Sequence, residues 1–247
     1  MPSIGKNPDR EVIEMNKFAL AASAVMAAAM LPAAAHAGSP DGKIQVKLLG
    51  TGVLPDGGLK EVKYVDPALL DVLLTVSPTA DFDTKANDNV VPTIAIEYFL
   101  TPNISVETIC CVTQHDVDGA AGLAGTELVS DAQVIPATFT LKYHFTEGPF
   151  KPYVGAGPTY FLWIKDKSGA TTQALGADSQ KMDDEFGFAL QAGVDFKLNE
   201  NGLGLSVDAK RYFVNQTAHW YANGTEVLRT EHDLDPWVVS AGLTYRM

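Results

Sequence analysis

Ten ionisable side chains stand at alternate positions of otherwise apolar segments, and no other pattern in this sequence has more scope for chemistry. Five are acidic and five are basic: Lys47, Glu97, Glu107, Lys142, Glu185, Asp195, Lys197, Asp208, Lys210 and Arg246. Successive residues of a β-strand point to opposite faces, so these charges are predicted to share one face of a sheet. Opposite charges enclosed there must pair, because a lone buried charge is costly. The pattern therefore predicts a network of internal ion pairs.

The predicted network has two interpretations. In the first, which the sequence favours, the ion pairs are structural and block the passage of ions. In the second, they form a polar plug beneath an outer apolar pocket that steers hydrophobic solutes. We expect that pocket to be lined or gated by side chains near the outer ends of their segments, namely Val53, Leu54, Phe161, Trp163 and Trp237.

The histidines do not have the spacing of a metal site. No H-x₃-H or H-E-x-x-H pattern occurs, although Asp116 and Asp233 are neighbours of two of them. The sequence therefore favours solvated loop residues over metal ligands for His115, His144, His219 and His232. It predicts no metal and no other cofactor.

Two further groups have reactive residue types without the arrangement that catalysis needs. His115, Asp116 and Ser130 have the residue types of an outer-membrane lipid-modifying enzyme, but no G-x-S-x-G elbow occurs. The adjacent Cys110 and Cys111 lack C-x-x-C spacing. A disulfide between neighbours in a strand would be strained, because their side chains point apart. We predict that the protein is not an enzyme.

Eight segments have the two-residue apolar period of a β-strand. The clearest is Phe186–Leu198, where seven apolar residues alternate with polar or small ones. The others are Ile44–Val53, Val90–Phe99, Ile104–Thr113, Ile135–Phe145, Tyr153–Trp163, Leu203–Lys210 and Trp237–Met247.

The connections between these segments alternate strictly between short and long. The short ones are rich in Pro, Gly and Asn, as tight turns are, and comprise residues 100–102, 146–149 and 199–201. The long ones comprise residues 55–88, 115–131, 165–182 and 215–233. Outer-membrane barrels have short periplasmic turns and long external loops. The sequence thus predicts an all-β fold, an eight-stranded antiparallel up-and-down transmembrane β-barrel, with both termini periplasmic and the long loops extracellular.

Aromatic residues at the strand ends favour a barrel whose large apolar side chains face lipid. Those at the turn end are typical of an interfacial girdle, and Trp163 and Trp237 lie near the opposite ends. The turn-end residues are Tyr98, Tyr143, Phe145, Phe196 and Tyr245.

The chain is acidic, with a formal net charge of −12, of which the four long connections carry −9. This balance argues against a nucleic-acid partner, which requires a basic surface. The first long connection also contains an apolar stretch over residues 68–74. A short helix capping the barrel mouth and a strand extension are both possible there, and we slightly favour the strand.

The N-terminal segment has the pattern of a secretory signal peptide. Lys17 precedes an apolar run over residues 18–31, and the stretch ends in Ala35-His36-Ala37. We expect translation to start at Met15, because the residues before it cancel the usual positive charge. Cleavage after Ala37 would remove residues 1–37 and leave a barrel of residues 38–247.

Several motifs resemble the outer-membrane protein W (OmpW) family, over essentially the whole predicted barrel. They are Lys151–Gly157 (KPYVGAG), Gln191–Asp195 (QAGVD), Leu234–Trp237 (LDPW), the closing SAGLTY of residues 240–245 and Pro136–Thr138. The resemblance implies an eight-stranded barrel with a narrow lumen that passes small hydrophobic molecules. Barrels of this kind usually end in Phe, whereas this chain ends in Met247 and has its aromatic residue at Tyr245.

Taken together, these observations predict passive passage or binding of small hydrophobic molecules at the outer membrane. The alternative is a closed structural or receptor-type barrel acting through its extracellular loops, and a lipid-modifying enzyme is a remote third. The expected partners are the lipid bilayer, the insertion machinery through the C-terminal strand, and small hydrophobic solutes. The oligomeric state stays open.

Overall fold

The computed structural model describes residues 39, 41–76, 81–145 and 148–247. The predicted signal peptide of residues 1–37, with its start at Met15 and cleavage after Ala37, lies outside these residues and stays a prediction.

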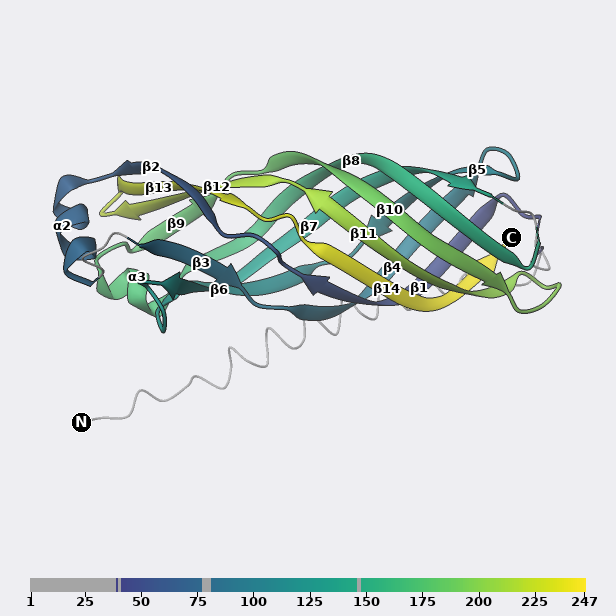
Figure 1. The fold of residues 1–247 in the computed structure, drawn as a ribbon, viewed down its shortest axis with the longest axis horizontal. Coiled ribbons are helices and arrows are strands. Elements are labelled where there is room, and N and C mark those ends of the chain that lie inside the picture. The colour runs from purple at the N-terminus through teal and green to yellow at the C-terminus, as the bar shows by residue number, and fades with distance from the viewer. Residues whose placement is uncertain (1–38, 40, 77–80, 146–147) are drawn as a thin grey trace. The chain divides into compact units, whose positions relative to one another are not determined.

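Eight antiparallel strands close into a barrel (Figure 1). Around the ring each strand pairs with its neighbour in chain order, and the last pairs with the first, Leu48 opposite Leu243. The strands are β1 (Ile44–Leu54), β4 (Asn89–Phe99), β5 (Ile104–Cys110), β7 (Glu127–His144), β8 (Phe150–Ser168), β10 (Glu185–Lys197), β11 (Leu203–Phe213) and β14 (Trp237–Arg246). The predicted eight-stranded antiparallel barrel is confirmed.

Side chains alternate between the lumen and the outer surface along these strands. On β1, Lys47, Leu49 and Thr51 are buried, whereas Leu48 between them is 47% exposed. Aromatic side chains are exposed at both ends of the outer surface, for example Tyr143 at the turn end and Phe186 near the other. This distribution is inverted relative to a water-soluble protein, and a lipid-facing surface accounts for it.

The four long connections are not loops for most of their length, which corrects the sequence-based expectation. They contain six strands: β2 (Leu59–Val65), β3 (Phe82–Ala86), β6 (Thr113–Ala121), β9 (Ser179–Met182), β12 (Asn215–Ala222) and β13 (Thr225–Asp233). Strands β3 and β6 continue the barrel sheet, and a second sheet runs β2-β13-β12-β9. These strands lengthen the barrel at the end opposite the C-terminus (Figure 1). We call this added part the outer extension.

The apolar face switches sides between the barrel and the outer extension. Asp208 and Lys210 point into the lumen of the barrel, while the apolar Val207 beside them is exposed. Further along the same row, Ala218 and Trp220 are the buried residues of β12. A strand that leaves the bilayer meets water outside, so its apolar residues must turn inward. This switch breaks the two-residue apolar period, so the period does not reveal the strands of the outer extension in the sequence.

Two helices complete the described structure. The stretch expected to extend a strand is instead the helix α2 (Pro67–Val76), which lies at the tip of the outer extension (Figure 1). Its apolar residues follow the helical period, and Leu69 and Leu73 line an interior cavity. The second helix is α3 (Ala170–Ala174). Neither is long and apolar enough to cross a membrane.

Candidate functional site

The lumen of the barrel contains a dense set of buried ion pairs. The Nζ atom of Lys142 lies 2.8 Å from Glu97 Oε2 and 2.9 Å from Glu107 Oε2, and that of Lys47 lies 3.0 Å from both oxygens. Lys47 also contacts Asp195 at 3.3 Å, and Lys210 contacts Glu107 and Asp208 at 3.2 Å each. Side chains of these seven residues, here called the lumen network, are almost completely buried.

Uncharged side chains complete the lumen network. Gln45 donates to Asp195 at 3.0 Å, Gln191 donates to Glu107 at 2.9 Å, and Ser105 donates to Glu97. The ring of Tyr153 lies 3.7 Å from the Lys142 ammonium. Sequence reasoning missed these residues because they are uncharged, although Gln45, Ser105 and Gln191 each stand on the same strand face as a charged member. Face periodicity was therefore a usable signal.

Three of the ten predicted lumen charges lie outside the lumen network. Glu185 is near the outer end of β10 and accepts a hydrogen bond from Thr217 at 3.2 Å. Lys197 is at the turn end, 2.6 Å from Glu200. Arg246 donates to the Gly42 carbonyl oxygen at 2.7 Å and stacks on Phe99 at 3.5 Å. Each stands at a strand end, where the alternation that predicted it gives way to the turn or the outer extension.

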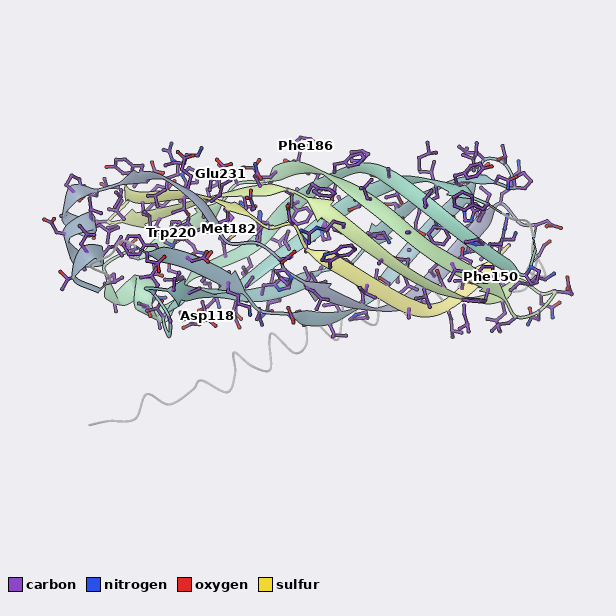
Figure 2. The ribbon with its side chains drawn as sticks, viewed as in Figure 1. Asp118, Phe150, Met182, Phe186, Trp220 and Glu231 are labelled. Carbon is purple, nitrogen blue, oxygen red and sulfur yellow. The ribbon has the colours of Figure 1, made fainter. Side chains whose placement is uncertain are left out.

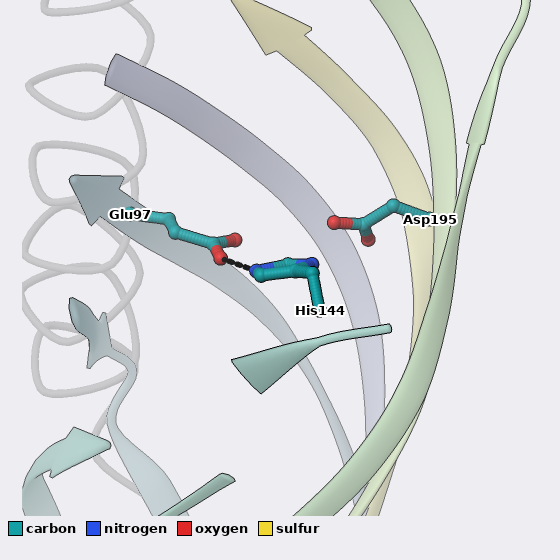
Figure 3. Close-up of side chains that lie close together, drawn as sticks. All are labelled: Glu97, His144 and Asp195. Carbon is teal, nitrogen blue, oxygen red and sulfur yellow. Dashed lines mark hydrogen bonds and ion pairs between the residues drawn. The ribbon is translucent and has the colours of Figure 1, made fainter. Parts of the chain in front are cut away.

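Glu97, His144 and Asp195 bring three possible metal-ligand atoms within 4.8 Å of one another (Figure 3). His144, expected in a solvated loop, is fully buried inside the barrel. Its Nε2 atom lies 2.9 Å from Glu97. The ammonium of Lys47 already lies between the two carboxylates, 3.0 Å from Glu97 and 3.3 Å from Asp195. Lysine charges thus neutralise this donor set, and it fits a structural ion pair better than a metal centre.

A layer of hydroxyl groups lies next to the lumen network on its outer side. Thr138 Oγ1 is 2.8 Å from Thr159 Oγ1 and 3.3 Å from the Tyr212 hydroxyl. Thr51 and Ser240 share a hydrogen bond of 3.0 Å across the β1–β14 pair. These groups satisfy one another. The lumen therefore changes from charged to polar and then to apolar along its length.

Beyond this layer lies an apolar cavity of about 560 Å³, within the size range of small-molecule sites. Its inner end is a buried cluster that includes Val53, Val134 and Phe161. Its walls in the outer extension include Met182 and Trp220, whose side chains point into the interior enclosed by the strands. Phe186, in contrast, projects outward (Figure 2). Leu69, Leu70 and Leu73 of α2 cover the outer end.

A profile of the OmpW family matches residues 40–247. The chain belongs to the OmpW family. It is 36% identical to the outer-membrane protein y4mB of Sinorhizobium fredii over 169 residues, which are 66% of this chain and 69% of that protein. It is 29% identical to outer membrane protein W of Vibrio cholerae over 161 residues, 63% of this chain and 73% of that protein.

Among solved structures, the barrel resembles the outer membrane protein OprG from Pseudomonas aeruginosa. The TM-score is 0.69 at 22% identity, over 84% of this chain and 97% of OprG, so the likeness concerns the fold. Together with the lipid-facing surface described above, these comparisons establish an OmpW-family barrel of the outer membrane.

The cavity of this OmpW-family barrel includes three of the five predicted pocket residues. Val53, Phe161 and Trp163 line it, and the Trp163 indole donates to Gln216 Oε1 at 2.6 Å. The predictions for Leu54 and Trp237 are wrong, because these side chains are 40% and 45% exposed on the outer surface. Each directly follows or precedes an inward residue of its strand, and a shift of one residue reverses the face.

Ser130 and His115, the nucleophile and base types noted in the sequence, each have other hydrogen-bond partners in the described part of the chain. Ser130 donates to Glu127. His115 bonds the Thr113 hydroxyl at 2.8 Å and the Asn87 carbonyl oxygen at 2.7 Å. His115 and His232 line the cavity wall, so they are not the solvated loop residues that the sequence favoured.

Proposed function

We propose that this barrel takes up small hydrophobic molecules in its outer cavity and lets them cross the outer membrane passively. The observation that carries this proposal is the apolar cavity of about 560 Å³ above a lumen filled with ion pairs. Removing apolar surface from water contributes about 25 cal/mol per Å². The free energy of a small hydrophobic solute is therefore lower in the cavity than in water, without any specific polar contact.

The lumen network supports the same proposal by excluding other solutes. An eight-stranded barrel is barely wide enough for its own side chains. An ion or sugar following the lumen would have to displace Lys47, Lys142 or Lys210 from their carboxylates, which are buried and paired. Breaking such pairs costs several kcal/mol, on the order of 3–5. The cavity thus accepts apolar solutes, and the lumen network beneath it blocks ions and sugars.

The proposal includes an orientation and a route of assembly. The outer extension would face the exterior, and both termini would lie at the periplasmic turn end. Strand β14, with Tyr245 and Met247 at its end, would be the segment that the insertion machinery recognises. The bilayer contacts the exposed apolar rows, and no enzymatic activity is proposed.

The alternative of a closed receptor-type barrel has one observation in its favour. Helix α2 covers the outer end of the cavity with Leu69 and Leu73. The two functions differ in whether the cavity exchanges apolar solutes with the surroundings.

Uptake of a fluorescent apolar probe by cells producing the wild type, Trp163→Lys or Trp163→Phe would test the proposal. We expect Trp163→Lys to lose most of the barrel-dependent uptake, because a charge enters the cavity wall. Trp163→Phe should keep most of it, because the wall stays apolar. Equal uptake by both variants, at equal amounts of folded protein, would contradict the proposed function.

A further inference from the structure

The residues that line the cavity include no lysine and no arginine. Among its lining residues, all of which the structure describes, the one charged group is the carboxylate of Asp233. All lysines of the lumen network lie on the far side of the hydroxyl layer and are engaged by Glu97, Glu107, Asp195 and Asp208. An anion inside the cavity would therefore find no counter-charge.

Two histidines line the cavity, and their surroundings keep them neutral. The His232 ring is held between Thr84 Oγ1 at 3.1 Å and Thr230 Oγ1 at 2.6 Å. Burial lowers the pKa of His232 to about 4 and also lowers the pKa of His115. Both histidines belong to the outer extension. Neither supplies a positive charge to a ligand at neutral pH.

Two basic residues of β2, each next to a cavity-lining residue, are paired with carboxylates. Lys60 contacts Glu231 at 3.1 Å and Asp233 at 3.3 Å. Lys63 contacts Glu61 and Glu231 at 2.7 Å each. The four connections that form the outer extension carry most of the acidic excess of the chain. The field around the mouth of the cavity therefore opposes anions as well.

We infer that the cavity takes uncharged apolar molecules and excludes the carboxylates of the same carbon skeleton. This inference rests on the proposed function and deepens it by naming the charge class of the solute. The reason is desolvation: a carboxylate entering the cavity gives up its water and receives no ion pair in return. An alcohol or hydrocarbon of equal length loses far less.

The three tryptophans of the chain supply a site-specific assay. Trp163 and Trp220 line the cavity, whereas Trp237 is on the outer surface. A Trp237→Phe variant thus reports on the cavity, and a Trp163→Phe/Trp220→Phe variant reports on quencher dissolved in the surrounding detergent. Bromine quenches tryptophan fluorescence on contact. Suitable probes are 8-bromooctan-1-ol and 8-bromooctanoate at about pH 8, where the acid is ionised.

After normalisation to the surface reporter, we expect the alcohol to quench the cavity reporter at a concentration at least about tenfold lower than the carboxylate. Equal quenching by both probes would overturn the inference and leave the proposed function standing. Quenching by neither would overturn both.

A charge-gain variant makes the test independent of probe solubility. Met182 lines the cavity and is close to lysine in length. We expect 8-bromooctanoate to quench Met182→Lys at a lower concentration than Met182→Leu, the matched variant that changes the same side chain without adding a charge. Continued exclusion of the carboxylate by folded Met182→Lys would show that the charge of the cavity wall does not determine which probe enters, and would overturn the inference.

Discussion

Replacement of Lys142 by methionine is predicted to be among the most damaging single changes to the stability of the barrel. The Lys142 ammonium lies 2.8 Å from Glu97 and 2.9 Å from Glu107, and its side chain is fully buried. Removing it takes one counter-charge from Glu97 and Glu107, and leaves Lys47 in contact with both and Lys210 in contact with Glu107. Loss of one partner from a buried pair costs about 3–5 kcal/mol, and we expect a loss of that size in the free energy of unfolding.

The assay is reversible urea unfolding in detergent or lipid. The folded fraction is measured by heat-modifiable gel migration and by tryptophan fluorescence. Lys197→Met is the matched control, because Lys197 pairs with the largely exposed Glu200 and such pairs contribute at most about 1 kcal/mol. The double variant Lys142→Met/Glu107→Gln should lose less than the two single variants combined, because one charge of each sign is removed. Equal losses for Lys142→Met and Lys197→Met would refute the argument that the lumen charges act as one buried network.

Two further predictions concern the outer extension and the lipid-facing surface. Because His232 stays neutral in the folded protein down to its pKa of about 4, while a free histidine titrates near 6.5, the unfolded chain binds the extra proton first. Lowering the pH from about 7 to 4 should therefore destabilise the outer extension by up to about 3 kcal/mol. Hydrogen exchange of the β13 amides measures this loss. A folded His232→Asn variant whose stability depends on pH as that of the wild type does would contradict the prediction. On the barrel exterior, Val207→Arg should lower the free energy of unfolding by about 2–4 kcal/mol, because it places a charge against lipid. A loss below about 0.5 kcal/mol in urea titrations would argue against lipid contact at Val207.

Much of the fold could be predicted from the sequence because lipid and lumen impose opposite demands on successive residues. Phe186–Leu198 and the other seven segments show this alternation over the part of each strand that contacts lipid. Beyond it the outer face meets water, and the apolar row moves to the inside, as Ala218 and Trp220 show. The alternation changes phase within one chain segment, so the apolar pattern does not reveal that residues 215–233 form β12 and β13.

The candidate site could be predicted in part for the same reason. Position near the outer ends of the segments predicted Val53, Phe161 and Trp163, which line the cavity, together with Leu54 and Trp237, which face outward. Position near a strand end does not determine the face, because neighbouring residues of a strand point to opposite sides. The contribution of Met182, Trp220 and α2 could not be predicted, since it depends on the outer extension, whose pairing joins segments far apart in the sequence.

The central claim is that an apolar cavity above a closed charge network selects solutes by polarity. The most direct measurement is solute passage through the purified protein in liposomes, comparing small apolar probes with ions and sugars. We predict passage of the apolar probes above the rate in protein-free liposomes, with ions and sugars retained. Passage of ions or sugars at the same rate, or no passage of apolar probes through a barrel shown to be folded, would contradict the claim.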